Sequence, residues 1–290
     1  MNSPLPRRPF GRGDVKLSVI GFGGIVVMKV EPDHAARTVA RAVEAGINYF
    51  DVAPTYGNAE ERLGPALEPF RKDCFLACKT TCRDAAGARG ELKRSLERLR
   101  TDHVDLYQLH GLADMKDDVD AVFTRGGAME AVVEARKAGL VRHVGFSAHT
   151  QETALAAMDR YDFDSLMFPV NFVAMIKTGF GREVLDQALR KGVTVMALKA
   201  LARGPWPKDA PERREYPRCW YQPITDRHQA DLALRFTLSQ PVAAALSPGE
   251  ERLLWLAVEL ATDLRPVTDE DMVRCRSLAN GLVPIFPKQA

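Results

Sequence analysis

The feature that most constrains the fold of this chain is an alternation between short apolar segments and longer segments of helical period. Eight segments are predicted as strands: Leu17–Gly21, Ile47–Asp51, Cys74–Lys79, Val104–His110, His143–Ser147, Ser165–Asn171, Thr194–Lys199 and Val242–Ser247. Apolar strands separated by helices belong to a parallel sheet that is covered on both faces. Eight such units favour a closed barrel, whereas five or six would favour an open sheet.

The segments between these strands carry the boundary signals of helices. Helices are predicted over Asp33–Glu44, Glu91–Arg100, Gly127–Ala138, Thr150–Asp159, Arg182–Arg190, Asp226–Leu238 and Glu250–Asp263. Asp33, which follows Pro32, is expected to cap the first helix, and Gly46 is expected to end it. The sequence therefore predicts an α/β chain in which each strand leads into a helix.

No linker or low-complexity segment interrupts this pattern. Residues 1–290 are therefore expected to form a single (β/α)8 TIM barrel domain. Arg8–Ser18, with Gly11-Arg12-Gly13-Asp14 at its middle, is predicted to be an N-terminal β-hairpin before the first barrel strand. Pro205–Pro223, which is rich in Pro, Arg and aromatic residues, is predicted to be a long loop on the barrel mouth.

Composition excludes several classes of partner. The formal net charge of +2 argues against nucleic acid or an acidic membrane, since both require clustered positive charge. Met1–Phe10 lacks the apolar stretch of a signal peptide, and no segment is apolar enough to cross a bilayer, so a cytoplasmic location is expected. Five cysteines are too few for a disulfide scaffold, and no metal site is expected. The sequence does not fix the oligomeric state.

Polar side chains stand where four neighbouring strands of the predicted barrel end. Asp51, Lys79, His110 and Ser147 close these strands, and Tyr56 follows Asp51 by five positions. In a barrel the active site lies at the carboxyl ends of the strands. Each residue alone has an ordinary structural explanation, as a turn cap, a rim residue or a packed core residue. Together they place an acid, an ammonium, an imidazole and a phenol at one mouth.

This set of groups suits carbonyl reduction. Hydride addition produces an alkoxide that must be protonated as it forms. A phenol has a pKa of about 10 and is a slow acid at neutral pH, but a nearby ammonium such as Lys79 lowers that pKa. A carboxylate keeps the ammonium charged, and His110 can orient the carbonyl oxygen. The hydride must come from a cofactor, because no side chain supplies one.

The same residues, in the same order, resemble the aldo-keto reductase superfamily. The resemblance rests on Ile47–Gly57, with its Asp-x-Ala-x-x-Tyr-Gly pattern, on Ala77–Lys79, on Asp105–His110 and on Ala138–Ser147. It implies a barrel that binds NADPH at its mouth and reduces a small-molecule carbonyl compound. It assigns Tyr56 as general acid, Lys79 and Asp51 as the pair that adjusts it, and His110 as the residue that orients the carbonyl.

The resemblance also implies cofactor contacts, and here the chain departs from the family pattern. Ser147 matches the family's serine, but Ala148 replaces the asparagine that follows it, and Met167 replaces a glutamine that holds the nicotinamide carboxamide. Asn171 or His149 is the candidate to compensate.

Further cofactor contacts are expected at Gly23, Asp51, Lys199, Ser247 and Arg252. Arg252 is the candidate for a 2′-phosphate contact, and Ser247 at a helix start suits an anion. Glu250 and Glu251, next to Arg252, would repel a phosphate, so NADP(H) is predicted while NAD(H) stays open.

Two other functions remain open at this stage. One is a cofactor-binding, redox-sensing regulatory subunit with vestigial turnover, which the altered carboxamide contacts would permit. The other is a lyase that uses Lys79 as a Schiff base, although Tyr56 and Asp51 would then have no evident purpose. The presence of all four groups favours an NAD(P)H-dependent reductase.

Overall fold

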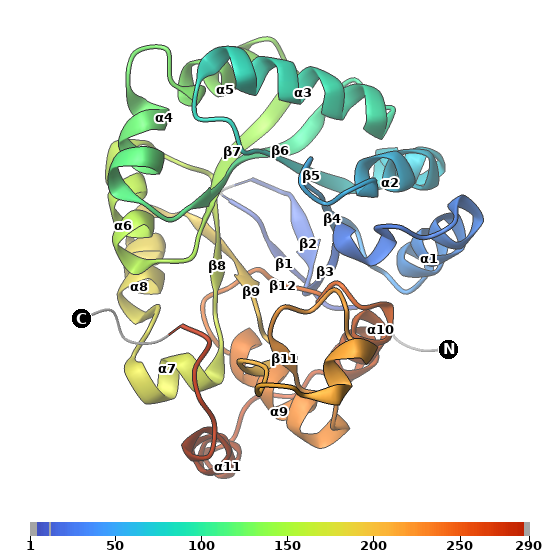
Figure 1. Ribbon diagram of the computed structural model, residues 1–290, viewed down its shortest axis with the longest axis vertical. Helices are drawn as coiled ribbons and strands as arrows, with labels where there is room; N and C mark the ends of the chain where they lie inside the picture. Colours follow the sequence, from blue (N-terminus) through green and yellow to red (C-terminus); the bar gives the residue numbers. More distant parts are fainter. Residues whose placement is uncertain (1–4, 12, 287–290) are drawn as a thin grey trace.

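The computed structural model describes residues 5–11 and 13–286, and a closed barrel of eight parallel strands lies at its centre (Figure 1). Around the barrel the strands follow the order β12-β3-β4-β5-β6-β7-β8-β9. Their bounds are β3 Ile20–Gly23, β4 Tyr49–Asp51, β5 Phe75–Thr80, β6 Val104–Leu112, β7 Val141–Ala148, β8 Ser165–Pro169, β9 Thr194–Leu198 and β12 Ala244–Leu246. The prediction of a (β/α)8 barrel is confirmed.

Helices cover the outside of the barrel, and most of them lie within a few residues of their predicted positions (Figure 1). The α-helices are α1 Pro32–Glu44, α2 Ala59–Leu67, α3 Ala85–Leu99, α4 Ala121–Phe123, α5 Ala128–Lys137, α6 Gln151–Arg160, α7 Phe172–Thr178, α8 Arg182–Lys191, α9 Arg227–Leu238, α10 Glu251–Thr262 and α11 Asp269–Asn280. Short helical turns η1 Gly24–Val27, η2 Glu68–Asp73, η3 Met115–Asp120 and η4 Pro211–Glu215 lie in the connections.

Some predicted boundaries were wrong, for identifiable local reasons. Helix α3 begins six residues earlier than predicted, because Asp84 accepts a hydrogen bond from the Gly87 backbone and caps it. The N-cap of α1 is Glu31, which leaves Asp33 in the first turn behind Pro32. The predicted first strand, Leu17–Gly21, covers the end of β2, Lys16–Ser18, and the start of β3.

The predicted N-terminal hairpin is present and closes one end of the barrel. Strands β1 Arg7–Pro9 and β2 Lys16–Ser18 pair antiparallel. The ring of Phe10 packs 4.8 Å from that of Phe75 and 5.0 Å from that of His143, both near the amino ends of barrel strands. Of the predicted turn, Arg12 lies outside the described residues. The hairpin seals the end opposite to the strand termini that carry the polar groups.

Apolar side chains fill the lumen above this plug. The hydrophobic cluster inside the barrel includes Tyr49, Leu106, Met167, Met196 and Leu246, one from each of five strands. Because this filling leaves no open pore, the polar side chains at the carboxyl ends of the strands lie at a closed floor and face the mouth.

The segment predicted as a long loop after the seventh barrel strand is partly ordered into secondary structure. Strands β10 Ala202–Gly204 and β11 Gln222–Pro223 pair with each other, and η4 lies between them. The indole nitrogen of Trp206 donates a 2.8 Å hydrogen bond to the carbonyl of Cys219 and draws the two sides of the segment together. We call residues 205–223 the mouth loop.

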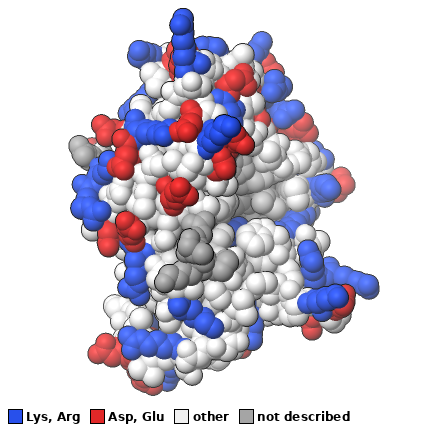
Figure 2. All heavy atoms as spheres, turned by 60° about the vertical axis from the view of Figure 1, so that its left-hand side comes forward, with Lys and Arg blue, Asp and Glu red and all other residues white. Residues whose placement is uncertain are grey.

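Charge on the surface is mixed in sign. On the face shown in Figure 2, basic and acidic side chains of the described residues intermingle over the upper half of the view. A surface of this kind does not provide the extended basic field that nucleic acid binding requires. Within the described part of the chain, none of the helices combines the length and the apolar character that a bilayer-spanning segment needs.

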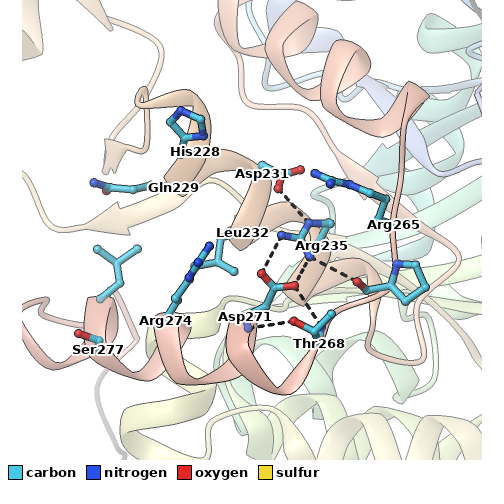
Figure 3. A pocket seen from close by; sticks show the side chains of 12 residues that line it. His228, Gln229, Asp231, Leu232, Arg235, Arg265, Thr268, Asp271, Arg274 and Ser277 are labelled. Atoms are coloured by element: carbon cyan, nitrogen blue, oxygen red, sulfur yellow. Dashed lines mark hydrogen bonds and ion pairs between the residues drawn. The ribbon is translucent and has the colours of Figure 1, made fainter.

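An ion-pair cluster joins α11 to the neighbouring helix α9, beside a cavity of about 660 Å³ between the two helices (Figure 3). Arg235 of α9 donates to both carboxylate oxygens of Asp271, at 2.6 and 3.1 Å, and also to Asp231. Asp271 completes a capping box with Thr268 at the start of α11. These contacts occupy the Arg235 guanidinium, so the cluster is a structural tie.

We expect Asp271→Ala to lower the free energy of unfolding by about 2–3 kcal/mol, because it leaves Arg235 short of a charged partner. Arg235 and the Thr268 amide hold the pKa of Asp271 well below its usual range. This contribution to stability is therefore present above about pH 4, the ordinary pKa of Asp, and is lost as the pH falls further. Urea unfolding at several pH values, with exposed Asp263→Ala as control, tests this. Equal stability of the two variants at pH 7 would contradict it.

Candidate active site

The predicted acid and ammonium form a buried ion pair at the barrel mouth. Asp51 ends β4 and Lys79 lies near the end of β5, so the closing of the barrel brings them together. Lys79 Nζ donates to Asp51 Oδ1 and, at 3.2 Å, to the carbonyl oxygen of Val52. The side chains of Asp51 and Lys79 are 4% and 0% exposed, so water does not screen the pair.

Tyr56 lies beside this pair. Lys79 Nζ is 5.1 Å from the centre of the Tyr56 ring, which projects from the turn after β4. The ring of His110, from β6, meets the Tyr56 ring edge-on, with centres 5.8 Å apart and planes at 85°. The structure therefore brings all four residues predicted as catalytic into one cluster.

Burial and charge act against each other in setting the acidity of these groups. Burial raises the pKa of Tyr56, and the charge of Lys79 opposes that rise. Burial favours neutral Lys79, but the charges of Asp51 and Tyr56 and the hydrogen bond to Asp51 together outweigh it and raise the pKa of the ammonium. Lys79 therefore stays charged at neutral pH, next to the phenol whose deprotonated form it stabilises.

His110 is a neutral imidazole across the physiological range. Burial, together with the positive charge of Lys79, lowers its pKa to about 3. A neutral imidazole keeps one N–H that can donate a hydrogen bond to a carbonyl oxygen. Its Nδ1 atom is buried without a protein partner among the described residues.

Gln108 is a member of the cluster that sequence reasoning missed. Its side-chain amide donates a 2.9 Å hydrogen bond to Asp51 Oδ2, the oxygen that Lys79 does not hold. The residue is buried in the middle of the apolar strand β6, two positions before His110. A glutamine inside an apolar strand was the available signal, because a buried amide requires hydrogen-bond partners.

Asp51, Tyr56 and His110 of this cluster line a cavity of about 280 Å³ at the barrel mouth, whereas Lys79 and Gln108 do not line it. Seven of the predicted site residues contribute to its wall: Gly23, Asp51, Tyr56, His110, Ser147, Lys199 and Ser247. Asn171 and Arg252 do not line this cavity. The mouth loop adds Arg218, Trp220 and Tyr221, so it forms one side of the site.

On the side of the cavity expected to hold the nicotinamide carboxamide, the polar groups differ from the family pattern. The Ser147 hydroxyl accepts a 2.7 Å hydrogen bond from the Gly111 backbone and keeps its own proton for donation. Met167 lines the cavity where a glutamine was expected. His149 also lines it, and its ring stacks on Phe286 with centres 5.9 Å apart.

Asn171 has a structural role in this arrangement. Its side-chain oxygen caps α7 by accepting from the Val173 and Ala174 backbones. Its amide nitrogen donates to the carbonyls of Lys199 and Ala202, at 3.0 and 2.8 Å. Its side-chain atoms thus cap α7 and hold the segment 199–202, and of the two candidates to replace the missing glutamine only His149 reaches the cavity.

Two cations of the cavity wall carry charge that no acid neutralises. Lys199 Nζ lies 5.3 Å from the ring centre of Trp220 and 5.1 Å from that of Tyr221, and burial lowers its pKa to about 8. Arg218 donates to the carbonyls of Val26 and Met28. Among the described lining residues the one acid is Asp51, which Lys79 already neutralises, so the wall has a net positive charge.

The loop between β12 and α10 closes the remaining side. The Ser247 hydroxyl accepts a 3.0 Å hydrogen bond from the Gly23 backbone. A Cβ atom on Gly23 would lie 2.8 Å from the Ser247 carbonyl oxygen, so this contact requires glycine. Arg252 instead stacks over Tyr216, 3.6 Å from its ring centre, and pairs with Glu215 of the mouth loop.

Comparisons with known proteins show the family of this chain. The chain matches the model of the aldo/keto reductase family over residues 19–218. The uncharacterized oxidoreductase YqkF of Bacillus subtilis (strain 168) is 25% identical, with 94% of this chain and 96% of the relative covered. Aldo-keto reductase family 1 member C1 of Homo sapiens is 28% identical, with 82% and 81% covered.

Solved structures show the same architecture. The holo form of an aldo-keto reductase from Bacillus halodurans superimposes with a TM-score of 0.73 at 25% identity, and the match covers 97% of each chain. The family model spans more than half of the 290 residues and includes Asp51, Tyr56, Lys79 and His110. This chain therefore belongs to the aldo/keto reductase family of oxidoreductases.

Proposed function

We propose that this protein reduces an aldehyde or ketone to the alcohol, with NADP(H) as the hydride carrier and Tyr56 as the general acid. The observation that carries the proposal is that the Tyr56 phenol and the neutral His110 imidazole line one cavity, with the buried Lys79 ammonium beside Tyr56. These are the groups that a carbonyl oxygen needs as negative charge develops on it.

The chain's own residues divide the chemistry among them. NADPH, when bound, supplies the hydride that adds to the carbonyl carbon. The His110 N–H donates a hydrogen bond to the substrate oxygen and orients it. Tyr56 transfers its phenolic proton to that oxygen, and Lys79 stabilises the phenolate that remains. Asp51 keeps Lys79 charged throughout.

The cavity wall fits the anionic cofactor. Lys199 and Arg218 provide two positive charges without acid partners among the described lining residues, and phosphate oxygens are natural partners for both. Gly23 and Gly249 also line the cavity, and both must be glycine because Cβ atoms there would meet Ser247 and Ile25 at 2.8 and 2.5 Å. Ser147 and Ser247 add hydroxyl groups on opposite sides.

The preference for NADP(H) over NAD(H) is a finer part of the proposal. Glu250 accepts a 2.7 Å hydrogen bond from the Arg218 backbone and so holds the mouth loop. Glu251 accepts from His34, Thr38 and Trp255 on the outer side of α10. Because neither Glu250 nor Glu251 lines the cavity, the cations Lys199 and Arg218 dominate its described wall, which favours the more highly charged cofactor.

Fluorescence titration with NADPH, and separately with NADH, tests the cofactor assignment. We expect tighter binding of NADPH, and we expect Lys199→Met to weaken it by about tenfold or more, the usual effect of losing a charge-assisted hydrogen bond. Lys208→Met, an exposed lysine of the same mouth loop, is the matched control. Equal affinity of the Lys199→Met and wild-type proteins would remove Lys199 from the cofactor site.

A further inference from the structure

Gln108 occupies a position next to the acid–base residues without lining the cavity. It lies on β6 as the register partner of Lys79 on one side and of Gly145 on the other. Asp51 Oδ1 accepts a hydrogen bond from Lys79, and Asp51 Oδ2 accepts a 2.9 Å hydrogen bond from Gln108. Within the described residues these are the two side chains that hold the carboxylate.

A glycine lies between Gln108 and Ser165 in the register of the barrel strands. A Cβ atom on Gly145 would lie 2.4 Å from the Ser165 hydroxyl and 3.1 Å from Leu106 Cδ1, so the hydroxyl of Ser165 lies directly over Gly145. Gly145 pairs with both Gln108 and Ser165, which brings these two side chains to either side of it.

The polar atoms on either side of this glycine lack partners. Gln108 Oε1 and Ser165 Oγ are both buried without a hydrogen-bond partner among the described residues. Buried polar groups of this kind are normally satisfied, and because these two atoms do not bond to each other, a bridging water is the partner that would serve both. Such a link would fix the amide with its oxygen toward Ser165 and its nitrogen toward Asp51.

We propose that Gln108 is a positioning residue that holds the Asp51 carboxylate in place and so keeps Lys79 charged beside Tyr56. This inference rests on the proposed reductase function. Gln108 acts through Asp51 and Lys79, and it contacts neither substrate nor cofactor. The Asp51–Lys79 pair alone leaves one carboxylate oxygen without a donor in a dry site, and Gln108 supplies that donor.

Removing the Gln108 amide changes the protonation of Asp51 and Lys79 and, through them, the pKa of Tyr56. Without the hydrogen bond the buried carboxylate is less stable in its charged form, so the Asp51–Lys79 pair shifts toward its neutral state. A neutral Lys79 no longer stabilises the Tyr56 phenolate, so the pKa of Tyr56 rises. The other titratable groups that face Tyr56 and the pair are Tyr49 of β4, Cys78 of β5 and His110 of β6.

The test is the pH profile of alcohol oxidation, the reverse reaction, which requires the Tyr56 phenolate. In Gln108→Met, which keeps the shape and removes the donor, we expect the midpoint of the profile to move up by about one pH unit, the equivalent of one hydrogen bond to a charged group. Oxidation at neutral pH then falls about tenfold, and carbonyl reduction falls less. An unchanged midpoint in the folded variant would overturn the inference.

A second readout does not depend on turnover. Near-ultraviolet tyrosinate absorbance, recorded as the difference between each protein and its Tyr56→Phe counterpart, follows Tyr56 without cofactor or substrate. It should show the same upward shift in Gln108→Met. Leu109→Met, a volume-conserving change of the adjacent buried residue on β6, should keep the wild-type midpoint.

The remaining outcomes also decide the question. If Gln108→Met does not fold, Ser165→Ala is measured in the same way; a smaller upward shift supports the inference, and no shift overturns it. If the wild-type protein shows no NADP(H)-dependent turnover in either direction, the proposed function fails and the inference fails with it. Wild-type turnover with an unshifted variant removes the role of Gln108 alone.

Discussion

Tyr56→Phe should lower kcat/KM for carbonyl reduction by about 10²–10⁴-fold, the usual contribution of a positioned general acid. The change removes the phenolic oxygen and leaves the ring that packs edge-on against His110. Because the ring keeps its shape, the affinity for NADPH and the melting temperature should stay close to those of the wild type. Steady-state kinetics, cofactor titration and thermal melting measure the three quantities.

Tyr161→Phe is the matched control, since Tyr161 packs against Phe163 at the far end of α6 and does not line the cavity. It should retain wild-type kinetics. Near-normal turnover in Tyr56→Phe would show that another group donates the proton and would overturn the assignment of Tyr56.

Lys79→Met should have the second large effect, on both activity and stability. It leaves the buried Asp51 carboxylate with Gln108 as its one side-chain donor among the described residues. Breaking a buried ion pair by removing one partner costs about 3–5 kcal/mol. Turnover should fall as well, because the Tyr56 phenolate loses the charge that stabilises it. Denaturant unfolding and kcat/KM measure the two effects.

The pH dependence of Lys79→Met follows from the same charges. Burial already raises the pKa of Asp51, and Lys79 opposes this rise in the wild type. In the variant the pKa rises further, so the folded state takes up a proton more readily than the unfolded state. The loss of stability should therefore shrink as the pH falls through that raised value and be greatest at higher pH.

The double variant Asp51→Asn with Lys79→Met separates the two effects. It removes both charges, so stability should recover toward that of the wild type while turnover stays low. A Lys79→Met protein as stable as the wild type at pH 8 would contradict the view that the pair is buried and mutually dependent.

The barrel and the catalytic cluster could be predicted because both follow from local patterns. Apolar strands alternating with helices define the fold, and parallel strands place their carboxyl ends at one mouth. Asp51, Lys79 and His110 stand at such ends, so their convergence follows once the barrel is assumed. The hairpin also has a local signal, the Gly-rich turn before Asp14.

The site residues that could not be predicted are those whose side-chain positions depend on tertiary contacts. Arg218 belongs to the mouth loop, and its place at the cavity depends on the carbonyls of Val26 and Met28, about 190 positions away in the chain. Asn171 was expected at the cofactor, but its side chain caps α7 one residue later. Arg252 was expected at a phosphate, but stacking on Tyr216 turns it toward the mouth loop.

Four α-helices were not predicted, namely α2, α4, α7 and α11, and the reasons differ for the two longest of them. Helix α2 contains Pro65, which in a sequence pattern argues against a helix, but the proline lies near the end of this nine-residue helix. The sequence signal for helix α11 is limited to the capping box of Thr268 and Asp271, which a weakly apolar segment follows. The ion pair between Asp271 and Arg235 shows that tertiary contact stabilises this helix.

The most direct test of NADP(H)-dependent carbonyl reduction at Tyr56 is the absorbance of NADPH, followed while the purified protein meets a broad panel of aldehydes and ketones. The account predicts that the absorbance falls with at least one carbonyl compound in the wild type and stays constant in Tyr56→Phe. Tight binding of NADPH without oxidation across the panel would contradict it and would favour a cofactor-binding regulatory role. Oxidation at equal rates in both proteins would contradict the mechanism.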